Sequence, residues 1–414
     1  MEQQTHILGQ QLARLRKQRR LSMQKLADAV GISAAYVCRL EAGDRKPSRE
    51  LVQKLADVLL SQNQQVEKDE LLIAGGFAPV NYRSRNLMGR QDVMALYENI
   101  LRENPEDFKA YIALVVNHIR SGNLEPAHQM IQEGLARFDD MVQLQALMAA
   151  LELAKQNFDQ AIQFQKEALH YYGVSPEQSR FLNEQDLLLG LGVMHFERGH
   201  DETYAAQLAR SQKQNTQAKT LEQKAFETLN QAKAIFEQAL DLDPADIYIL
   251  DELARVNFTL AYLLSPEEAL PYWQASIVAF EKTVCAPQKE DLGYKPLLQS
   301  TAFLGLAYAK AQQFQQAWFT LNVVEACLPN YWLVHYLKAC YFGLLFLAEH
   351  GNKKKLSTTE QNYLQQALQA LEKSAAISDD ENRACAEAML DPDLAPLRKY
   401  CTADFDALLK KWGN

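Results

Sequence analysis

The first 60 residues of the chain carry apolar side chains at helical spacing. The first predicted helix has one apolar face, made of Ile7, Leu8, Leu12 and Leu15. Its other positions include the basic residues Arg14, Arg16, Lys17, Arg19 and Arg20. Further apolar runs each follow a serine that can act as an N-cap, namely Ser22, Ser33 and Ser48. Gly31 can take the left-handed geometry that ends the second helix. The pattern therefore predicts four short helices, with a tight turn between the second and third.

Two short helices joined by a turn around a glycine form a helix-turn-helix, whose second helix can enter the major groove of DNA. This part of the chain resembles the XRE family of Cro-like and phage-repressor-like helix-turn-helix proteins. The matching segments are Leu21–Ala27, Val30–Ser33, Tyr36–Val37 and Arg39–Ser48. The resemblance implies a regulator that recognises specific DNA sequences as a dimer.

The same resemblance assigns DNA contacts. It places Ser33 to Tyr36 at the start of the recognition helix, Arg39 one turn later, and Arg45 and Lys46 against phosphates. An alanine can touch only a thymine methyl group, so base discrimination is expected from Arg39, the Ser33 hydroxyl, Tyr36 and DNA shape. Gln24 stands one position later than the glutamine of many relatives. The expected DNA-binding set is Gln24, Ser33, Ala34, Ala35, Tyr36, Arg39, Arg45 and Lys46.

Two further expectations concern the interior of this domain. The XRE resemblance implies an ion pair between Arg16 and Glu41 beneath the motif. A buried pair restricts geometry more than it adds stability. Cys38 is expected to pack inside the domain, since no cysteine partner lies near it in the sequence.

A period of 34 residues appears after residue 92. Ala127 and Ala161 are 34 positions apart, and so are Gly134 and Ala168. Three sets of residues also share offsets of 4, 7 and 12: Val93, Tyr97, Ile100 and Pro105; Ala232, Phe236, Ala239 and Pro244; and Ala317, Leu321, Val324 and Pro329. Small residues, apolar knobs and a terminal proline at this period describe a repeated helix pair. This segment resembles the tetratricopeptide repeat (TPR), in about seven copies. Residues 199–224 interrupt the period, and this insertion is expected to be an extended helix or a mobile excursion.

Arrays of TPR type curl into a superhelix whose inner surface comes from the leading helix of each pair. The residues expected to line this groove are Lys109, Ile112, Tyr248, Asp251, Glu252, Arg255, Phe303 and Tyr336. Such a groove could take a peptide with apolar side chains and a basic group. The alternative is that the charges at 251, 252 and 255 form ordinary pairs one helical turn apart.

Composition narrows the function classes. A chain of 414 residues with 48% hydrophobic and 23% charged residues is folded and too long for one ordinary core. Residues 1–60 hold 11 Lys and Arg against 6 Asp and Glu, whereas the remainder holds 32 against 46. A basic head of net charge +5 on a body of −14 indicates that only the head meets a polyanion.

Several other classes are excluded or disfavoured. Six scattered cysteines without a C-x-x-C pair, and a start without a signal-peptide pattern, indicate a reduced, cytoplasmic protein. The apolar segment at 331–348 is interrupted by His335 and Lys338, which favours a buried helix over a membrane span. Nucleotide-binding, metalloprotease and nucleophile-elbow motifs are absent, and the eight histidines do not cluster at metal spacing. No enzyme activity, catalytic residue, cofactor or metal is expected.

The sequence thus predicts an all-α protein. Its expected parts are a helix-turn-helix domain of four to five helices at 1–70, a linker at 71–91, a TPR superhelix at 92–380 and capping helices at 381–414. The expected function is transcription regulation, as a repressor or an activator. A homodimer would bind a double-stranded DNA operator, while the body binds a peptide or protein and controls dimer geometry. In domain order the chain resembles peptide-pheromone receptors and arbitrium-type phage regulators. The alternative is a TPR adaptor tethered to DNA by the head, or an antitoxin-like partner-binding protein.

Overall fold

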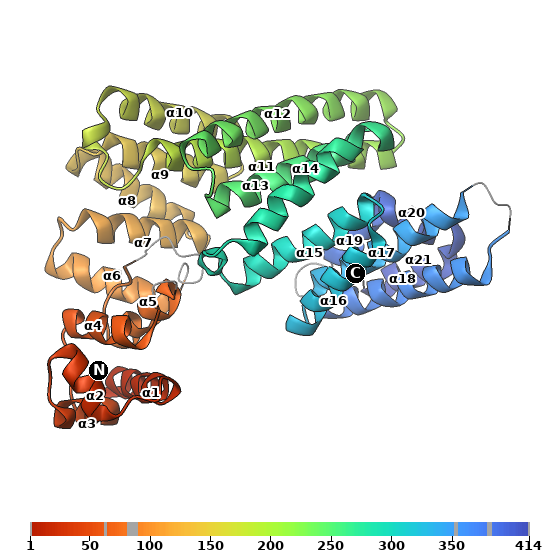
Figure 1. Cartoon of the computed structure of the whole chain (residues 1–414). Helices are drawn as coiled ribbons and strands as arrows, with labels where there is room; N and C mark the ends of the chain where they lie inside the picture. The colour runs from red at the N-terminus through yellow and green to blue at the C-terminus, as the bar shows by residue number, and fades with distance from the viewer. Residues whose placement is uncertain (1, 62–63, 81–89, 352–354, 379–382, 413–414) are drawn as a thin grey trace. The chain divides into compact units, whose positions relative to one another are not determined.

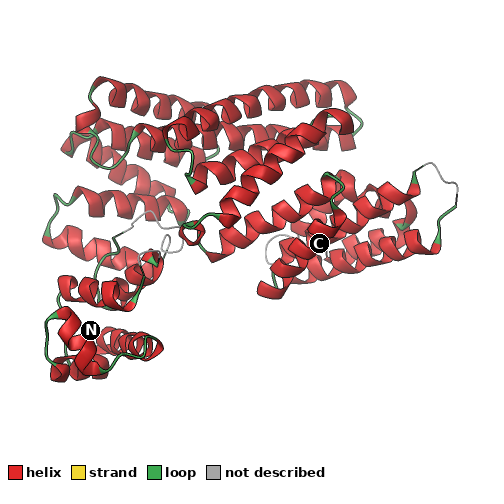
Figure 2. Ribbon diagram, viewed as in Figure 1, coloured by secondary structure: helices red, strands yellow, loops and turns green. Residues whose placement is uncertain are grey.

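A computed structural model describes residues 2–61, 64–80, 90–351, 355–378 and 383–412. All regular elements within these ranges are helical (Figures 1 and 2). The all-α prediction is therefore confirmed. The part of the predicted linker at 81–89 lies outside the described residues. The chain divides into two compact units, residues 1–183 with 287–293, and residues 184–286 with 294–414.

The first unit begins with the five helices of the head: α1 (Glu2–Gln18), α2 (Met23–Val30), α3 (Ala34–Ala42), α4 (Arg49–Leu59) and α5 (Gln65–Ala74). The predicted caps are confirmed, because the side chains of Ser22, Ser33 and Ser48 each accept a hydrogen bond from a backbone amide of the first turn. Gly31 ends α2 in the left-handed conformation, with φ of 75°.

The core of the head holds its helices at close range. Leu8 and Leu12 of α1 are buried with Leu26 of α2 and Leu55 of α4. Helix α1 also approaches the end of α3 so closely that a Cβ atom on Gly9 would lie 2.5 Å from the carbonyl oxygen of Glu41. The backbone of α1 therefore sets the position of α3.

The rest of the first unit consists of α6 (Gln91–Glu103), α7 (Phe108–Arg120), α8 (Leu124–Arg137), α9 (Met141–Ala154), α10 (Phe158–Val174) and the short turns η1 (Pro176–Gln178) and η2 (Lys289–Leu292). Helices α7 with α8, and α9 with α10, form antiparallel pairs. The small residues at the 34-residue period, Ala127, Ala161 and Ala168, are fully buried where the helices meet. Their small size permits the close packing that the repeat requires.

The second unit continues the helix pairs. They are α11 (Glu184–Ser211) with α12 (Asn215–Leu242), α13 (Ile247–Tyr262) with α14 (Pro266–Cys285), α15 (Tyr294–Lys310) with α16 (Phe314–Cys327), and α17 (Trp332–His350) with α18 (Thr358–Ile377). The insertion at 199–224 lengthens α11 and α12 to 28 residues each. The extended helix is thus the correct one of the two expectations.

The predicted capping segment also folds as helices. It comprises α19 (Arg383–Leu390), η3 (Pro392–Leu394), α20 (Ala395–Tyr400) and α21 (Thr402–Trp412). Leu394, Leu397 and Phe405 from this segment are buried in one core with α17 and α18. Residues 332–348 of the apolar segment lie in α17 and contribute to the same core. No helix in the described part of the chain combines the length and apolar character that a membrane crossing needs.

Candidate nucleic-acid interface

Helix α3 presents small side chains and one arginine to solvent. Ala35, Cys38, Arg39 and Ala42 are all exposed, and their spacing of three or four residues places them on one helix face. The opposite face is anchored by Val37 and Leu40, which are buried in the head. A short helix whose exposed face carries mostly small side chains fits the width of the major groove of B-DNA.

The ion pair predicted beneath α3 is confirmed. Arg16 Nε lies 2.6 Å from Glu41 Oε1, and a second guanidinium nitrogen lies 2.8 Å from Glu41 Oε2. The third donates to the carbonyl oxygen of Leu21 at 2.9 Å. Hydrogen bonding to Glu41 raises the pKa of Arg16. Since the side chains are only 10% and 8% exposed, this bidentate pair ties α1 to the end of α3 and to the turn before α2.

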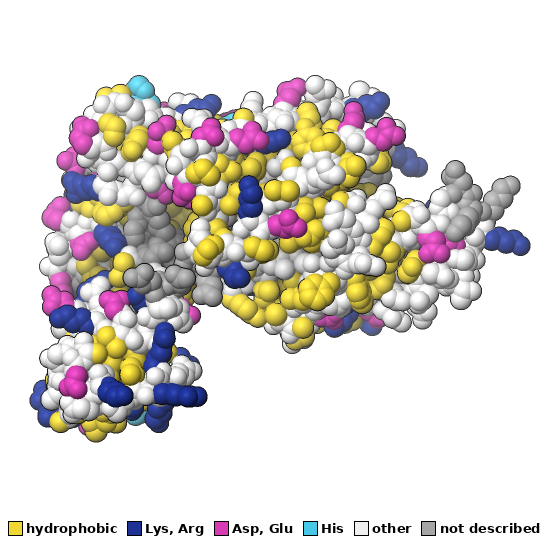
Figure 3. All heavy atoms as spheres, in the orientation of Figure 1, with side chains coloured by type: hydrophobic (Ala, Val, Ile, Leu, Met, Phe, Trp, Pro, Cys, Tyr) yellow, Lys and Arg dark blue, Asp and Glu magenta, His cyan; other side chains and the backbone are white. Residues whose placement is uncertain are grey.

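The expected phosphate contacts are accessible. Arg45 and Lys46 are exposed in the loop between α3 and α4, and the Lys46 ammonium lies 5.7 Å from the centre of the Phe77 ring. Gln24 is exposed in the first turn of α2, where it donates to Asp28 at 2.7 Å. Figure 3 shows Lys and Arg side chains gathered over the N-terminal helices. A cationic surface of this kind suits the DNA backbone.

The remaining predicted base-reading residues differ in accessibility. Ala34 and Tyr36 are half-buried and pack against the core of the head. Ser33 is exposed, and its hydroxyl accepts from the Tyr36 amide at 3.2 Å as the cap of α3, so its hydrogen and one lone pair remain for contacts with DNA. Ser33, Ala35 and Arg39 are therefore the predicted base-reading residues that the fold leaves exposed.

The structure corrects one expectation and adds one residue. Cys38 is exposed rather than packed inside, because it precedes Arg39 on the outer face while Val37 takes the core position. Ala42 shares that face and was missed. Its spacing of three residues from Arg39 was the signal that could have found it.

The two predicted groove residues of the first unit differ in exposure. Ile112 is 1% exposed and lies in the core between α7, α8 and α9. Lys109 is half-buried, and its ammonium donates to the carbonyl oxygen of Val80 at 3.1 Å. Burial lowers the pKa of Lys109, and the charge of Arg49 adds to this effect. Only Lys109 of the two reaches a surface.

The charged groove candidates on α13 form a cluster with α11 and α15. Asp251 accepts a hydrogen bond from Ser300 at 2.5 Å, and Arg255 lies 3.6 Å from Glu252 one turn away. The Arg255 guanidinium also lies over the Phe196 ring at 5.3 Å. Asp251 and Glu252 are buried, whereas Tyr248 and Arg255 are half-buried. The pairing one turn apart was the alternative interpretation of these charges.

Glu197 of α11 belongs to this cluster but was missed, since it lies in another repeat. Burial raises the pKa of Glu197, the positive charge of Arg255 opposes that rise, and the negative charge of Glu252 adds to it. The cluster is thus richer in carboxylates than the sequence suggested.

Phe303 and Tyr336 are covered by other parts of the second unit. Phe303 is half-buried and packs edge-on against Phe258, with ring centres 5.4 Å apart. Tyr336 is 4% exposed, and its hydroxyl donates to Asp391 Oδ2 at 2.8 Å. The polar end of Tyr336 therefore faces a segment of the chain's own C-terminal part.

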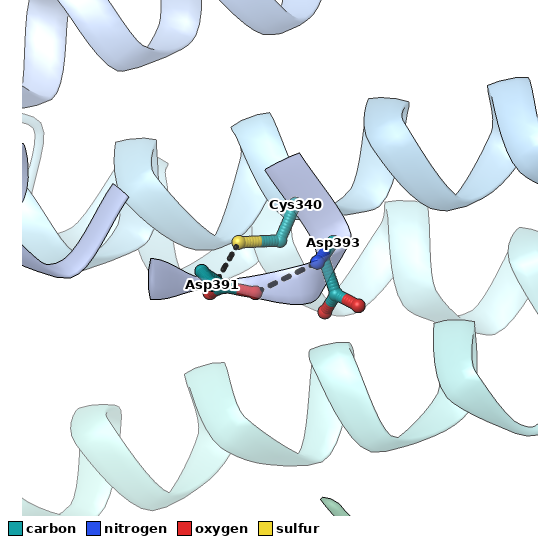
Figure 4. A group of neighbouring side chains, drawn as sticks. All are labelled: Cys340, Asp391 and Asp393. Carbon is teal, nitrogen blue, oxygen red and sulfur yellow. Dashed lines mark hydrogen bonds between the residues drawn. The ribbon is translucent and has the colours of Figure 1, made fainter. Parts of the chain in front are cut away.

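Asp391 is one of three neighbouring side chains that offer metal-ligand atoms. The ligand atoms of Cys340, Asp391 and Asp393 lie within 4.8 Å of one another (Figure 4). Burial and the nearby carboxylates raise the pKa of the Cys340 thiol well above its usual value, which disfavours the thiolate that binds metals. Both carboxylates already accept protein hydrogen bonds. The arrangement fits a hydrogen-bonded network better than a metal centre.

Comparisons with known proteins match separate parts of the chain. Residues 7–71 match the model of a helix-turn-helix domain, and residues 91–151 match the model of a tetratricopeptide repeat. A search of curated proteins found no match.

Three solved structures show a distant likeness to this chain. The Cut9–Hcn1 hetero-tetramer of the APC/C has 16% identity and a TM-score of 0.33, over 96% of this chain and 68% of that chain. PlcR of Bacillus thuringiensis, in complex with the peptide PapR7 and DNA, has 15% identity and a TM-score of 0.29, over 77% of this chain and 96% of that chain. Yeast Tom70 has 10% identity and a TM-score of 0.27, over 95% of this chain and 91% of that chain.

The two domain matches agree with the capped helices of the head and the helix pairs that follow. The chain therefore combines an XRE-like helix-turn-helix domain at its N-terminus with a C-terminal tetratricopeptide-repeat domain.

Proposed function

We propose that the chain is a sequence-specific, DNA-binding transcription regulator. The observation that carries this proposal is the exposed face of α3, formed by Ala35, Cys38, Arg39 and Ala42. Laid in the major groove, this face would present the Arg39 guanidinium to the O6 and N7 atoms of a guanine. The alanine methyl groups would meet thymine methyls.

Phosphate contacts would set the register of the head on DNA. Arg45 and Lys46 would bind phosphates beside the groove, and Gln24 would do so at the start of α2. These residues are exposed and belong to the basic segment of net charge +5. Phosphate binding of this kind is independent of sequence, so specificity would rest on the α3 face.

The body would act as the partner-binding and dimer-forming part. Helix-turn-helix and TPR domains are binding domains, which favours a regulatory over an enzymatic function. TPR arrays expose an extended surface for a peptide or protein. A partner bound there would favour one homodimer arrangement over another and so control whether the two heads stand one DNA turn apart, about 34 Å. We also expect a protein that binds operator DNA to act in the cytoplasm.

The first test is a fluorescence anisotropy titration of the full chain against fragments of its own upstream region, repeated over a salt series. Tight binding to one fragment over bulk DNA is the expected result. Equal, weak binding to every fragment, with and without cell extract, would contradict a sequence-specific regulator and favour a TPR adaptor.

Two variants separate the assigned roles. Arg39→Ala should lose roughly 1–3 kcal/mol of discrimination between operator and mismatched DNA. Lys46→Ala should weaken binding to all DNA about equally and reduce the salt slope by about 1. The matched controls are Arg102→Ala and Lys219→Ala, exposed residues of α6 and α12, which should bind as the wild type does. The opposite pattern between Arg39 and Lys46 would refute the assignment.

A further inference from the structure

The chain's own segment Asp391–Leu394 lies against three successive leading helices of the repeat array. The Tyr262 hydroxyl, at the end of α13, donates to Asp393 Oδ2 at 3.1 Å. Lys310, at the end of α15, donates to Asp393 Oδ1. Tyr336 of α17 donates to Asp391 Oδ2 at 2.8 Å. Each contact is made by a leading helix, the helix of each pair that lines the inner surface of a TPR array.

The segment packs closely against α17. A Cβ atom on Gly343 would lie 2.1 Å from the carbonyl oxygen of Asp393, so a side chain at this position would collide with the backbone of the segment. Leu394 is fully buried directly after Asp393. The surface that contacts Asp391–Leu394 therefore accommodates two acidic residues one position apart, followed by an apolar side chain.

The side chains that contact Asp393 include a cation, Lys310, packed against two aromatic rings. The Lys310 ammonium lies 4.1 Å from the centre of the Tyr262 ring and 5.4 Å from that of Trp273. Aromatic faces attract a cation and hold it in place. Figure 4 shows Asp391 beside Cys340 of α17, while the carboxylate of Asp393 points away from Cys340. The two acids thus occupy separate positions.

The chemistry of this surface differs from that of the rest of the cap. Leu397, Phe405 and Leu408 close the end of the array with apolar packing, which needs no charge. A buried ion pair carries a desolvation cost, and apolar replacement of such pairs is often neutral or stabilising. Burial raises the pKa of Asp393 to about 6 despite the positive charge of Lys310. Closing the array alone would not require these carboxylates, whereas binding an acid would.

We infer that the leading-helix face formed by Tyr262, Lys310 and Tyr336 is a binding site for an acidic peptide segment, and that Asp391–Leu394 occupies it as a tethered ligand. A partner's segment with two acids one residue apart and an apolar residue after them would displace it. This inference rests on the proposed role of the body in partner binding and names the ligand class and the competitor. It also accounts for the burial of Tyr336.

A peptide titration tests the inference without DNA, so its failure is distinguishable from failure of the proposed DNA binding. The probe is a fluorescein-labelled peptide with the sequence of residues 388–397, titrated with the full-length wild type and with Asp391→Asn/Asp393→Asn. The variant should bind at least about 10-fold more tightly, because the tethered segment competes in the wild type at an effective concentration on the order of mM.

Two controls identify the contacts. A probe with both aspartates replaced by asparagine should bind at least about 10-fold more weakly, since it cannot pair with Lys310. Adding Lys310→Met to the double variant should remove the preference for the acidic probe. Equal binding of both probes, or equal binding by the variant and the wild type, would show a permanent closure and overturn the inference.

Hydrogen exchange of the wild type decides the question if the variant does not fold. Displacement requires the segment to leave its binding position, so the amides of Asp391, Asp393 and Leu394 should exchange at least about 10-fold faster than amides 337–346 of α17. Equal protection of the two segments would overturn the inference.

Discussion

Replacing Arg16 by methionine should destabilise the head strongly. The change leaves the Glu41 carboxylate, 8% exposed, without the two charged donors that lie 2.6 and 2.8 Å from its oxygens. It also removes the donor of the Leu21 carbonyl. Breaking a buried pair by removing one partner costs about 3–5 kcal/mol. Because some exposure remains, we expect about 3 kcal/mol, which corresponds to roughly a 100-fold change in an opening equilibrium.

Hydrogen exchange measured by mass spectrometry is the suitable assay, since it resolves the head within the full chain. Amides of α1 and α3 should exchange roughly 100-fold faster in Arg16→Met, while those of α13 and α15 keep their rates. Arg14→Met is the matched control, because Arg14 is exposed on the same helix. A second variant, Arg16→Met/Glu41→Leu, should recover most of the protection, since no buried charge is left unpaired. Unchanged exchange in Arg16→Met, or no recovery in the double variant, would refute the reasoning.

Two other predictions follow from single positions. Gly9→Ala should also destabilise the head, by about 1–3 kcal/mol, because the new Cβ would lie 2.5 Å from the Glu41 carbonyl oxygen; unchanged exchange of α1 and α3 would contradict this. Burial alone would raise the pKa of Glu325, but hydrogen bonds from Lys338 and Lys373 lower it to about 2. The lowered pKa contributes stability above the unfolded value of 4.5 that is lost as pH falls towards 2. Urea unfolding at pH 6 and pH 3 should therefore show a loss of about 1–2 kcal/mol in the wild type that Glu325→Gln lacks; an equal loss in both would disprove the assignment.

The helix-turn-helix was predictable because its signals are local. A serine cap accepts from an amide three residues on, and an apolar stripe identifies the buried face within two turns. The Arg16–Glu41 pair spans 25 positions, and only the resemblance to a known family suggested it. Val37 and Leu40 were expected in the core from their spacing and are buried there, whereas the expectation that Cys38 packs inside was wrong, because Cys38 lies on the outer face of the same helix.

The groove residues were harder to predict. The repeat period indicated helix pairs, which the structure has, but helical spacing does not reveal what covers a helix face. Ile112 packs inward against α8 and α9. Glu197 joins the charged cluster from a helix in another repeat.

The sequence by itself determined the elements and their order: an all-α chain, a capped helix-turn-helix at the N-terminus, helix pairs at the TPR period and a helical cap. Periodicity and capping act over a few residues and can be recognised without a partner. Tertiary structure alone decided which leading-helix side chains remain open. The contacts that cover Tyr336 and Tyr262 join residues 55 and 131 positions apart. Such contacts depend on how the finished helix pairs stack, because only stacking brings the ends of α13 and α15 and the middle of α17 to the same aspartates.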